Sequence, residues 1–299
     1  MRLSNGINSK FYVLLFFSVN NLGTKVNMNN PVVKLNLSDK VVYVVGDVHG
    51  RFDLLNKLLD QVNFDPCANV LIACGDLIDR GEHSIEMLNL LKQNYFYSVR
   101  GNHEDLLLDF FEHYIESGKI QEKIFLYDED PFIFNGGGWV KKLYSKSENK
   151  MSSEFDEFIQ LIKRMPFVIC VEIADKRFNV IHAQATRPFK LRDKEENFLW
   201  LDSDFDHWYE TKVMPESAAK NILWGRTIMH SYQMLRDIKI YKGLSDTYCG
   251  HTPYHIGEIR KLLSHNFLDT GAYLSSKKNN HWGLTMVNAI TNEKYVAVG

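Results

Sequence analysis

The feature that most constrains the fold is an apolar run that ends in a polar, glycine-flanked turn. Val41 to Val45 are five consecutive β-formers without alternation, and Gly46-Asp47-Val48-His49-Gly50 follows them directly. Such a run predicts a strand buried on both faces, as in the sheets of α/β proteins. Those sheets bind ligands beyond the carboxyl ends of their strands. We therefore expect Asp47 and His49 to lie at a ligand-binding edge.

The same arrangement recurs twice. The run 70–74 leads into Gly75-Asp76-Leu77-Ile78-Asp79-Arg80-Gly81, and the run 95–99 leads into Arg100-Gly101-Asn102-His103-Glu104. Amphipathic segments from Asp53 and from Ser84 separate the three runs and predict parallel β-α-β crossovers. Carboxylate, amide and imidazole ligands at one edge suit divalent transition ions, and a carboxylate can bridge two ions about 3.5–4 Å apart. The pattern indicates a two-metal hydrolytic site.

Two later histidines are also expected at strand exits. His182 follows the apolar segment 178–181, and His251 follows the short run 247–249 within Gly250-His251-Thr252-Pro253. Each repeats the placement of His49 and His103, so both are candidate ligands. Between them and the first strands lies Asn135-Gly136-Gly137-Gly138-Trp139, which we interpret as a loop near the site because glycines permit close backbone approach.

The later strands predict a second sheet. Segments 167–173 and 178–181 are interpreted as paired strands, and 267–272 and 283–290 as completing the second set. Two packed mixed β-sheets flanked by helices, a four-layer αββα arrangement of the α/β class, would bury so many strands. Residues 31–39 are interpreted as a polar lead-in to the first strand.

One segment, about 187–219, fits no single period and is interpreted as an irregular insertion on the substrate side. It carries the acidic residues Asp202, Asp204 and Asp206, for which a solvated loop is favoured over an ion site. We expect an N-terminal extension over residues 1–30 and a single domain over 31–299 that contains this insertion.

The N-terminal extension allows two interpretations. Arg2 and Lys10 precede the apolar run Phe11 to Val19, as in a secretory signal over residues 1–23, although the following residues form a poor cleavage site. Translation from Met28 is the alternative. Nine apolar residues are too few to span a bilayer, so no stable membrane insertion is expected. Four cysteines without C-x-x-C spacing favour a reducing compartment, and we favour a cytoplasmic enzyme, with secretion as the alternative.

Charge excludes one class of partner. The formal net charge is −2 and no basic stripe occurs, so a nucleic-acid groove is not indicated. The sequence leaves the oligomeric state open.

Taken together, these blocks resemble the metallophosphoesterase superfamily, in particular the serine/threonine protein phosphatases of the bacteriophage lambda type. The resemblance runs in order from Val41 to Ala272, and both the 135–139 loop and Leu268-Asp269-Thr270-Gly271-Ala272 fit it. It implies the calcineurin-like αββα fold and hydrolysis of phosphomonoesters. The expected substrates are phosphoproteins or phosphopeptides carrying phosphoserine, phosphothreonine and, further, phosphotyrosine.

The resemblance also implies roles for individual residues. Asp47, His49 and Asp76 would hold a first metal ion, and the bridging Asp76 would hold a second together with three more ligands: Asn102, His182 and His251. Mn²⁺ is favoured, with Fe²⁺ or Zn²⁺ compatible with the same ligands. Water shared by two cations is acidified toward neutrality, which gives a hydroxide for attack on phosphorus.

Four further residues receive catalytic roles by resemblance. His103 would be the general acid, oriented by Asp79, and Arg80 and Arg226 would bind phosphate oxygens. Arg187 is a rival for the position of Arg226.

Two other functions stay open at this point. A symmetrical dinucleoside tetraphosphate hydrolase shares the metal ligands, although Asp79 and Glu104 favour the protein phosphatase. A catalytically inactive phosphate-binding or scaffold protein is disfavoured because no expected ligand is missing. Gln184 stands where lambda-type enzymes tend to carry an acidic residue, which leaves substrate choice open. The other histidines are interpreted as surface or ordinary core residues: His83, His113, His207, His230, His255, His265 and His281.

Overall fold

The computed structural model of the chain describes residues 30–114, 130–145, 148, 150–187, 198–230, 242–254, 259–276 and 281–299. Apart from residue 30, the expected N-terminal extension lies outside the described residues, and so does the alternative start at Met28. Among the residues that are described, no helix is both long and apolar enough to cross a membrane.

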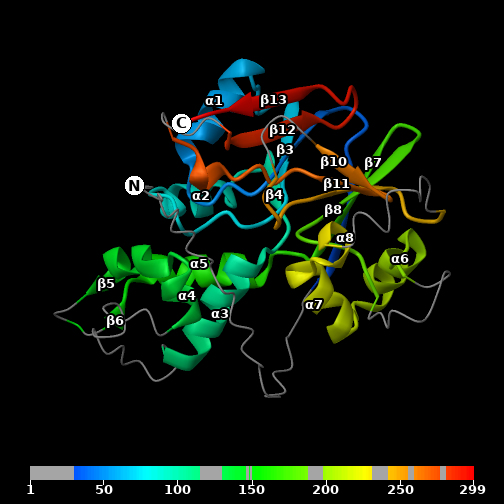
Figure 1. Cartoon of the computed structure of the whole chain (residues 1–299). Helices are drawn as coiled ribbons and strands as arrows, with labels where there is room; N and C mark the ends of the chain where they lie inside the picture. The colour runs from blue at the N-terminus through cyan, green and yellow to red at the C-terminus, as the bar shows by residue number, and fades with distance from the viewer. Residues whose placement is uncertain are drawn as a thin grey trace, which may run out of the picture.

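Two mixed sheets form the centre of the molecule (Figure 1). The five-stranded sheet has the order β13-β12-β2-β3-β4. Its strands are β2 (Val41–Val45), β3 (Asn69–Ala73), β4 (Phe96–Ser98), β12 (Leu284–Asn288) and β13 (Lys294–Ala297). The six-stranded sheet has the order β1-β7-β8-β9-β11-β10. Its strands are β1 (Val32–Asn36), β7 (Val168–Ile173), β8 (Lys176–Ile181), β9 (Asp246–Cys249), β10 (Arg260–Leu262) and β11 (His265–Phe267).

Register brings the polar turns to a common edge. β2, β3 and β4 are parallel, and Val45 pairs with Ala73, which pairs with Ser98. The three strands therefore end side by side, as the repeated strand-and-turn pattern predicts. In the other sheet β8 and β9 are also parallel neighbours. Their carboxyl ends deliver His182 and His251 to the same region.

Side-chain alternation builds the layers. Val42 and Val44 pack with Ile169 and Val171 of β7 between the two sheets. The alternate side chains of β2, Tyr43 and Val45, face the helices of the five-stranded side. These helices are α1 (Phe52–Gln61), α2 (Ser84–Leu90), α3 (Asn102–Tyr114), α4 (Pro131–Phe134), α5 (Ser153–Lys163) and the 3₁₀ helix η2 (Gly137–Leu143). A small hairpin, β5 (Tyr144–Ser145) and β6 (Lys150–Met151), adjoins them.

The outer face of the six-stranded sheet is covered separately. Its helices are α6 (Asp202–Thr211), α7 (Glu216–Trp224) and α8 (Thr227–His230), and the 3₁₀ helix η3 (Ala272–Leu274) follows the last strand of that sheet. Helices thus flank two packed sheets, and the four-layer α/β arrangement expected from the sequence is confirmed.

Three predictions are wrong in detail. The supposed lead-in at 31–39 contains β1, an edge strand that pairs in parallel with β7. The segment 283–290 forms β12 of the first sheet, antiparallel to β2, and not part of the second. The insertion at 187–219 is not irregular where it is described, because α6 and the start of α7 occupy it; residues 188–197 lie outside the described part.

Candidate active site

Five strand ends converge on one buried polar cluster. β2 supplies Asp47 and His49, β3 supplies the 76–80 turn and β4 leads into α3 at Asn102. Backbone bonds tie these turns together: the His49 N–H donates to the Asp76 carbonyl at 2.8 Å, and the Gly250 N–H to the His182 carbonyl at 2.7 Å. The His251 N–H donates to Oδ2 of Asp47 at 2.8 Å, which joins the two sheets at the site.

The turns of this cluster have strained backbones. Five non-glycine residues adopt the left-handed region: His49 (φ 47°), Asp76 (φ 47°), Asp79 (φ 71°), Arg80 (φ 68°) and His251 (φ 72°). Each such conformation costs on the order of 1–3 kcal/mol and persists only where its surroundings fix it. Strain gathered at one polar cluster is typical of a functional site.

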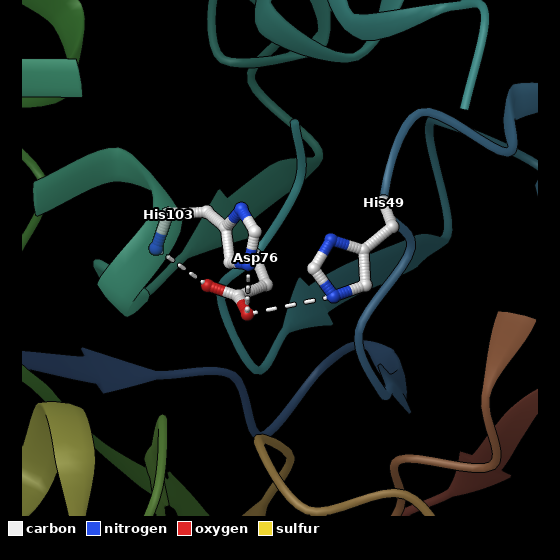
Figure 2. A group of neighbouring side chains, drawn as sticks. All are labelled: His49, Asp76 and His103. Carbon is white, nitrogen blue, oxygen red and sulfur yellow. Dashed lines mark hydrogen bonds and ion pairs between the residues drawn. The ribbon is translucent and has the colours of Figure 1, made fainter. Parts of the chain in front are cut away.

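His49, Asp76 and His103 form the first of two groups with metal-ligand spacing (Figure 2). Oδ2 of Asp76 lies 3.5 Å from Nε2 of His49 and 3.9 Å from Nε2 of His103. Nδ1 of His49 lies 3.0 Å from the Ile78 carbonyl, which can only accept, so this nitrogen carries the proton and Nε2 faces the cluster. Burial lowers the pKa of His49 well below its ordinary value and keeps the ring neutral.

Asp76, His182 and His251 form the second group, and Asn102 lies between the two histidines. Nδ1 of His182 donates to the Cys74 carbonyl at 2.8 Å. Its Nε2 therefore faces inward, 2.8 Å from Oδ1 of Asn102 and 3.1 Å from Nδ1 of His251. Burial lowers the pKa of His182 and places the pKa of His251 well below its ordinary value, so both rings favour the neutral form.

Asp76 belongs to both groups. Its Oδ1 accepts from the His103 N–H at 3.0 Å and lies 3.5 Å from Nε2 of His182. Burial alone would raise the pKa of this carboxyl, but the neighbouring His182, His103 and His49 lower it below its usual range. An ionised carboxylate between the two groups has the placement of a bridging ligand.

Asp47 offers an unused oxygen beside these groups. Its Oδ1 is buried and has no hydrogen-bond partner among the described residues. Burial, with Asp269 and Asp76 nearby, raises the pKa of Asp47 well above its ordinary value. A Cβ at Gly250 would collide with Oδ1 of Asp47, so the chain approaches this carboxylate as closely as only glycine allows.

The oxygen and nitrogen atoms that face this cluster suit divalent metal ions as ligands. The inward lone pair of neutral His182 meets the Asn102 oxygen at 2.8 Å, which sets two acceptors against each other, and Oδ1 of Asp47 is an orphaned acceptor. Buried acceptors without donors are costly, and a cation satisfies them together. Carboxylate, amide and imidazole ligands suit Mn²⁺, Fe²⁺ and Zn²⁺.

Glu104 fixes the turn that carries Asp76. Its fully buried carboxylate accepts from the N–H groups of Asp76 (2.9 Å), Leu77 (2.8 Å) and Gly101 (2.8 Å). Burial raises the pKa of Glu104 to about 7, and the Asp76 carboxylate adds to this rise. In the sequence Glu104 only favours one function over another, whereas these backbone bonds show that it positions the Asp76 turn.

His103 and Asp79 form a buried pair. Nδ1 of His103 lies 2.6 Å from Oδ2 of Asp79, and the other Asp79 oxygen accepts from Nε1 of Trp139 at 2.7 Å. Burial alone would lower the pKa of His103, but the carboxylates of Asp76 and Asp79 raise it above its ordinary value. The protonated form needed by a general acid is therefore favoured.

The loop 135–139 lies beside the site, as the sequence predicts.

The structure separates the two rival arginines. Arg226 donates from Nη1 to Oγ1 of Thr252 at 3.0 Å, one residue from His251. Arg187 pairs instead with Asp204, with Nη2 2.8 Å from Oδ2, and stacks over the Trp200 ring at 4.0 Å. Arg187 is thus bound to α6 and to the segment directly before it.

Arg80 lies at the cluster itself. Its Nη1 is 2.9 Å from Nε2 of His49, and its guanidinium lies over the ring of Tyr273 at 4.2 Å. Tyr273 also meets the His49 ring edge-on at 5.1 Å. Tyr273 had no predicted role, and its position directly after the Leu268–Ala272 block was the available signal.

Asp269 is a second residue without a predicted role. It is buried, and its Oδ1 accepts from the Gly271 N–H at 2.9 Å. Burial raises the pKa of Asp269 to about 6, and Asp76 adds to this rise. The residue belongs to the Leu268–Ala272 block, so the family resemblance was the signal for it.

The acidic cluster of the insertion is not a solvated loop. Asp206 pairs with Arg177 and Lys34, with contacts of 2.9 and 2.8 Å. Asp202 accepts from Nδ2 of Asn179 at 2.8 Å. These bonds anchor α6, and the cluster is structural.

This fold and this cluster define a class of protein. The chain belongs to the calcineurin-like phosphoesterase family, whose sequence model matches residues 40–255. It is 39% identical over 191 residues to serine/threonine-protein phosphatase 2 of Salmonella typhimurium, a match that covers 63% of this chain and 80% of that protein. It is 34% identical over 198 residues to serine/threonine-protein phosphatase 2 of Escherichia coli K12, covering 64% and 82%.

A shorter likeness concerns the alternative function. Over 68 residues the chain is 50% identical to the symmetrical bis(5'-nucleosyl)-tetraphosphatase of Actinobacillus succinogenes, covering 22% of this chain and 25% of that protein. The likeness to the phosphatases spans most of their length, and this one does not. The family resemblance and the fold class expected from the sequence are confirmed.

Proposed function

We propose that the protein is a metal-dependent serine/threonine protein phosphatase that hydrolyses phosphoserine and phosphothreonine in proteins, with phosphotyrosine as a further substrate. Long matches to two bacterial serine/threonine protein phosphatases support this substrate class. The observation that carries the chemistry is the convergence of neutral, inward-facing imidazoles on the ionised Asp76. Mn²⁺ as the native ion, a cytoplasmic location and a single catalytic domain over 31–299 belong to the same proposal.

The proposed ligands draw on the two groups, with Asp47 in place of His103 in the first and Asn102 added to the second. Asp47, His49 and Asp76 would hold one ion, and Asp76, Asn102, His182 and His251 the other. When bound, two such ions acidify a shared water and stabilise charge on phosphoryl oxygens. The orphaned Oδ1 of Asp47 supports its assignment as a ligand.

The protein's own residues complete the reaction. An alkoxide leaving group needs a proton, and Nε2 of His103 would give one as the bond from phosphorus to oxygen breaks. Asp79 holds the opposite nitrogen of the same ring at 2.6 Å and stabilises the protonated imidazole. Arg80 and Arg226 would bind phosphate oxygens in the bidentate manner of guanidinium groups.

Matched substrates test this proposal. Enzyme stripped with a chelator and reloaded with Mn²⁺ is assayed on a phosphothreonine peptide and on a dinucleoside tetraphosphate. We expect turnover of the peptide to dominate and to be lost in the stripped enzyme. Preference for the dinucleotide would instead establish the hydrolase, which shares the metal ligands. Phosphate binding without turnover of either substrate would establish the inactive binding protein.

A further inference from the structure

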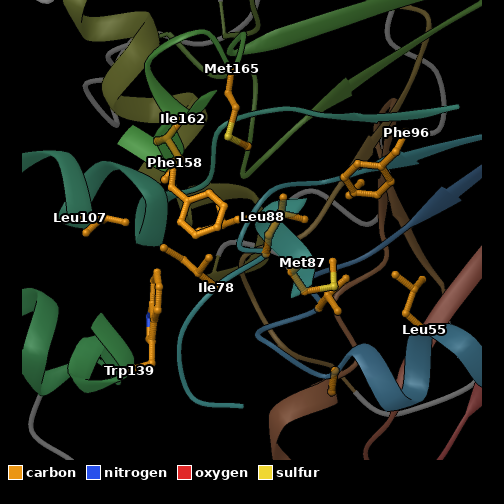
Figure 3. Close-up of a cluster of buried hydrophobic side chains, with 14 of the residues drawn as sticks. Leu55, Ile78, Met87, Leu88, Phe96, Leu107, Trp139, Phe158, Ile162 and Met165 are labelled. Atoms are coloured by element: carbon orange, nitrogen blue, oxygen red, sulfur yellow. The ribbon is translucent and has the colours of Figure 1, made fainter. Parts of the chain in front are cut away.

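One side chain of the glycine-rich loop reaches the catalytic pair directly. Trp139 is 8% exposed and lies in the buried cluster that also holds Ile78 and Leu107 (Figure 3). Its indole Nε1 donates to Oδ1 of Asp79 at 2.7 Å. The other Asp79 oxygen lies 2.6 Å from Nδ1 of His103. Trp139, Asp79 and His103 therefore form one continuous hydrogen-bonded chain.

This series of hydrogen bonds is shielded from solvent, and its geometry is fixed. Asp79 is 0% exposed and His103 is 1% exposed, so water does not compete for these bonds. Hydrogen bonds in such surroundings are strong, and an unpaired carboxylate oxygen would be costly. With Oδ1 held by the indole, Oδ2 of Asp79 is the oxygen turned to the imidazole.

The glycines explain how the tryptophan gets there. Gly136 has φ 105°, and a Cβ on it would collide with the backbone nitrogen of Arg80. At Gly137 a Cβ would collide with the ring of Phe132. The loop can thus lie directly against the Asp79–Arg80 turn. The 3₁₀ helix η2 begins at Gly137 and contains Trp139, whose indole reaches Asp79 in that turn.

We infer that Trp139 is a positioning residue for His103 and acts through Asp79. This inference rests on the proposed phosphatase function. The indole keeps its proton throughout. Nε2 of His103 gives its proton to the leaving oxygen, which retains the electron pair of the broken bond to phosphorus. Trp139 fixes the carboxylate that holds the imidazole ready for this transfer.

Leaving-group dependence tests the inference, because only a poor leaving group needs the acid. Trp139→Phe retains a buried ring and removes the N–H. We expect turnover of a phosphothreonine peptide to fall about tenfold or more, which is part of the roughly 10²–10⁴ that general acid catalysis contributes. Turnover of 4-nitrophenyl phosphate, whose leaving group is stable as an anion, should stay near the wild-type value. Equal loss on both substrates would overturn the inference.

A matched control exists in the same protein. Trp200 is 8% exposed, and its buried Nε1 has no hydrogen-bond partner among the described residues. Trp200→Phe makes the same chemical change without removing a hydrogen bond, so the ratio of the two turnover numbers should remain that of the wild type. Thermal melting and manganese content of both variants are measured alongside.

A double-mutant cycle separates this inference from the function on which it rests. His103→Asn alone should lose peptide turnover far more than nitrophenyl phosphate turnover; if it does not, the proposed acid is wrong. In that background Trp139→Phe should change peptide turnover no further. Additive losses would show that Trp139 acts independently of His103.

A measurement without any change at Trp139 covers the case in which the variant is too unstable to assay. In protein carrying ¹⁵N-labelled tryptophan, Asp79→Asn replaces the carboxylate acceptor by a weaker amide acceptor. We expect one indole N–H resonance to move clearly upfield. If none moves, the hydrogen bond from Trp139 to Asp79 is absent in solution and the inference is overturned.

Discussion

At the residue scale, the two arginines that were rivals for one role differ in their partners. Arg226 lies beside Thr252 and its own charge is felt by His182 and His251. Arg187 is bound to Asp204 and stacked on Trp200. We expect Arg226→Ala to lower kcat/KM on a phosphothreonine peptide about 10²-fold, as loss of one preorganised charge donor does.

Arg187→Ala is the matched control for that prediction. It should leave kcat/KM close to the wild-type value and lower the free energy of unfolding by about 1 kcal/mol or less, as a partly exposed ion pair allows. Steady-state kinetics and urea unfolding check both variants. A large catalytic loss in Arg187→Ala with none in Arg226→Ala would exchange the two roles.

Residues at the site were predictable in unequal measure. Asp47, His49 and Asp76 follow strands directly, so local sequence places them at the sheet edge. The choice between Arg226 and Arg187 depends on contacts with Thr252 and Asp204, and no local pattern encodes those contacts.

At the element scale, α6 is held by charge as well as by apolar burial. Asp206 accepts from Nη1 of Arg177 with both oxygens, at 3.0 and 2.9 Å, and pairs with Lys34 of β1. Although burial opposes it, hydrogen bonding to Arg177 and Lys34 lowers the pKa of Asp206. We expect Asp206→Asn to lower the free energy of unfolding at pH 7 by about 1 kcal/mol or less, because the pair is partly exposed.

The sign of the pH dependence follows from the lowered pKa. The stabilisation is present above the ordinary value of 3.8 and is lost as the pH falls through the lower value of the folded protein. In 1 M salt the difference in free energy of unfolding between the wild type and Asp206→Asn should become smaller. Asp175→Asn, in the exposed turn between β7 and β8, is the control and should have little effect. If the loss in free energy of unfolding of Asp206→Asn is unchanged by salt, the substitution has removed packing and not a charge interaction.

Elements buried on both faces were predictable, whereas edge and insertion elements were not. β2 is a continuous apolar run, but β1 is an edge strand in which apolar and polar residues alternate over Val33-Lys34-Leu35-Asn36, and this resembles a polar lead-in. β12 joins the first sheet because its partner is β2, far away in the sequence. In α6 the carboxylates of Asp202 and Asp206 meet partners on other strands, so its charge suggested a loop.

At the scale of the whole molecule, a buried histidine couples folding to pH. His265 of β11 is 0% exposed and accepts from the Ala185 N–H at 3.0 Å through Nε2, and its Nδ1 has no hydrogen-bond partner among the described residues. Burial lowers the pKa of His265 to about 3. The sequence left open whether this histidine is a surface or an ordinary core residue, and the structure places it in the core. Because this residue takes up a proton only in the unfolded chain, acidification lowers the free energy of unfolding of the whole protein.

The sign of the effect follows from proton binding. Between the ordinary pKa of 6.5 and the folded value of about 3, the unfolded chain binds a proton at this residue and the native protein does not. Acidification therefore costs about 1.4 kcal/mol per pH unit across that window. His265→Gln removes the titration while retaining an acceptor for the Ala185 N–H. We expect this variant to have a lower free energy of unfolding than the wild type at pH 7.5. Below a pH of about 6.5 the difference between the two proteins should decrease by about 1.4 kcal/mol per pH unit.

Urea unfolding of both proteins at pH 7.5, 6.5, 5.5 and 4.5 measures the slope, with a chelator present so that metal release does not contribute. The exposed His207 gives the control, because His207→Gln should keep the wild-type slope. Parallel stability curves for the wild type and His265→Gln would mean that the core admits the proton. The cluster of strands, helices and turns around β11 would then have to open locally well before the protein unfolds.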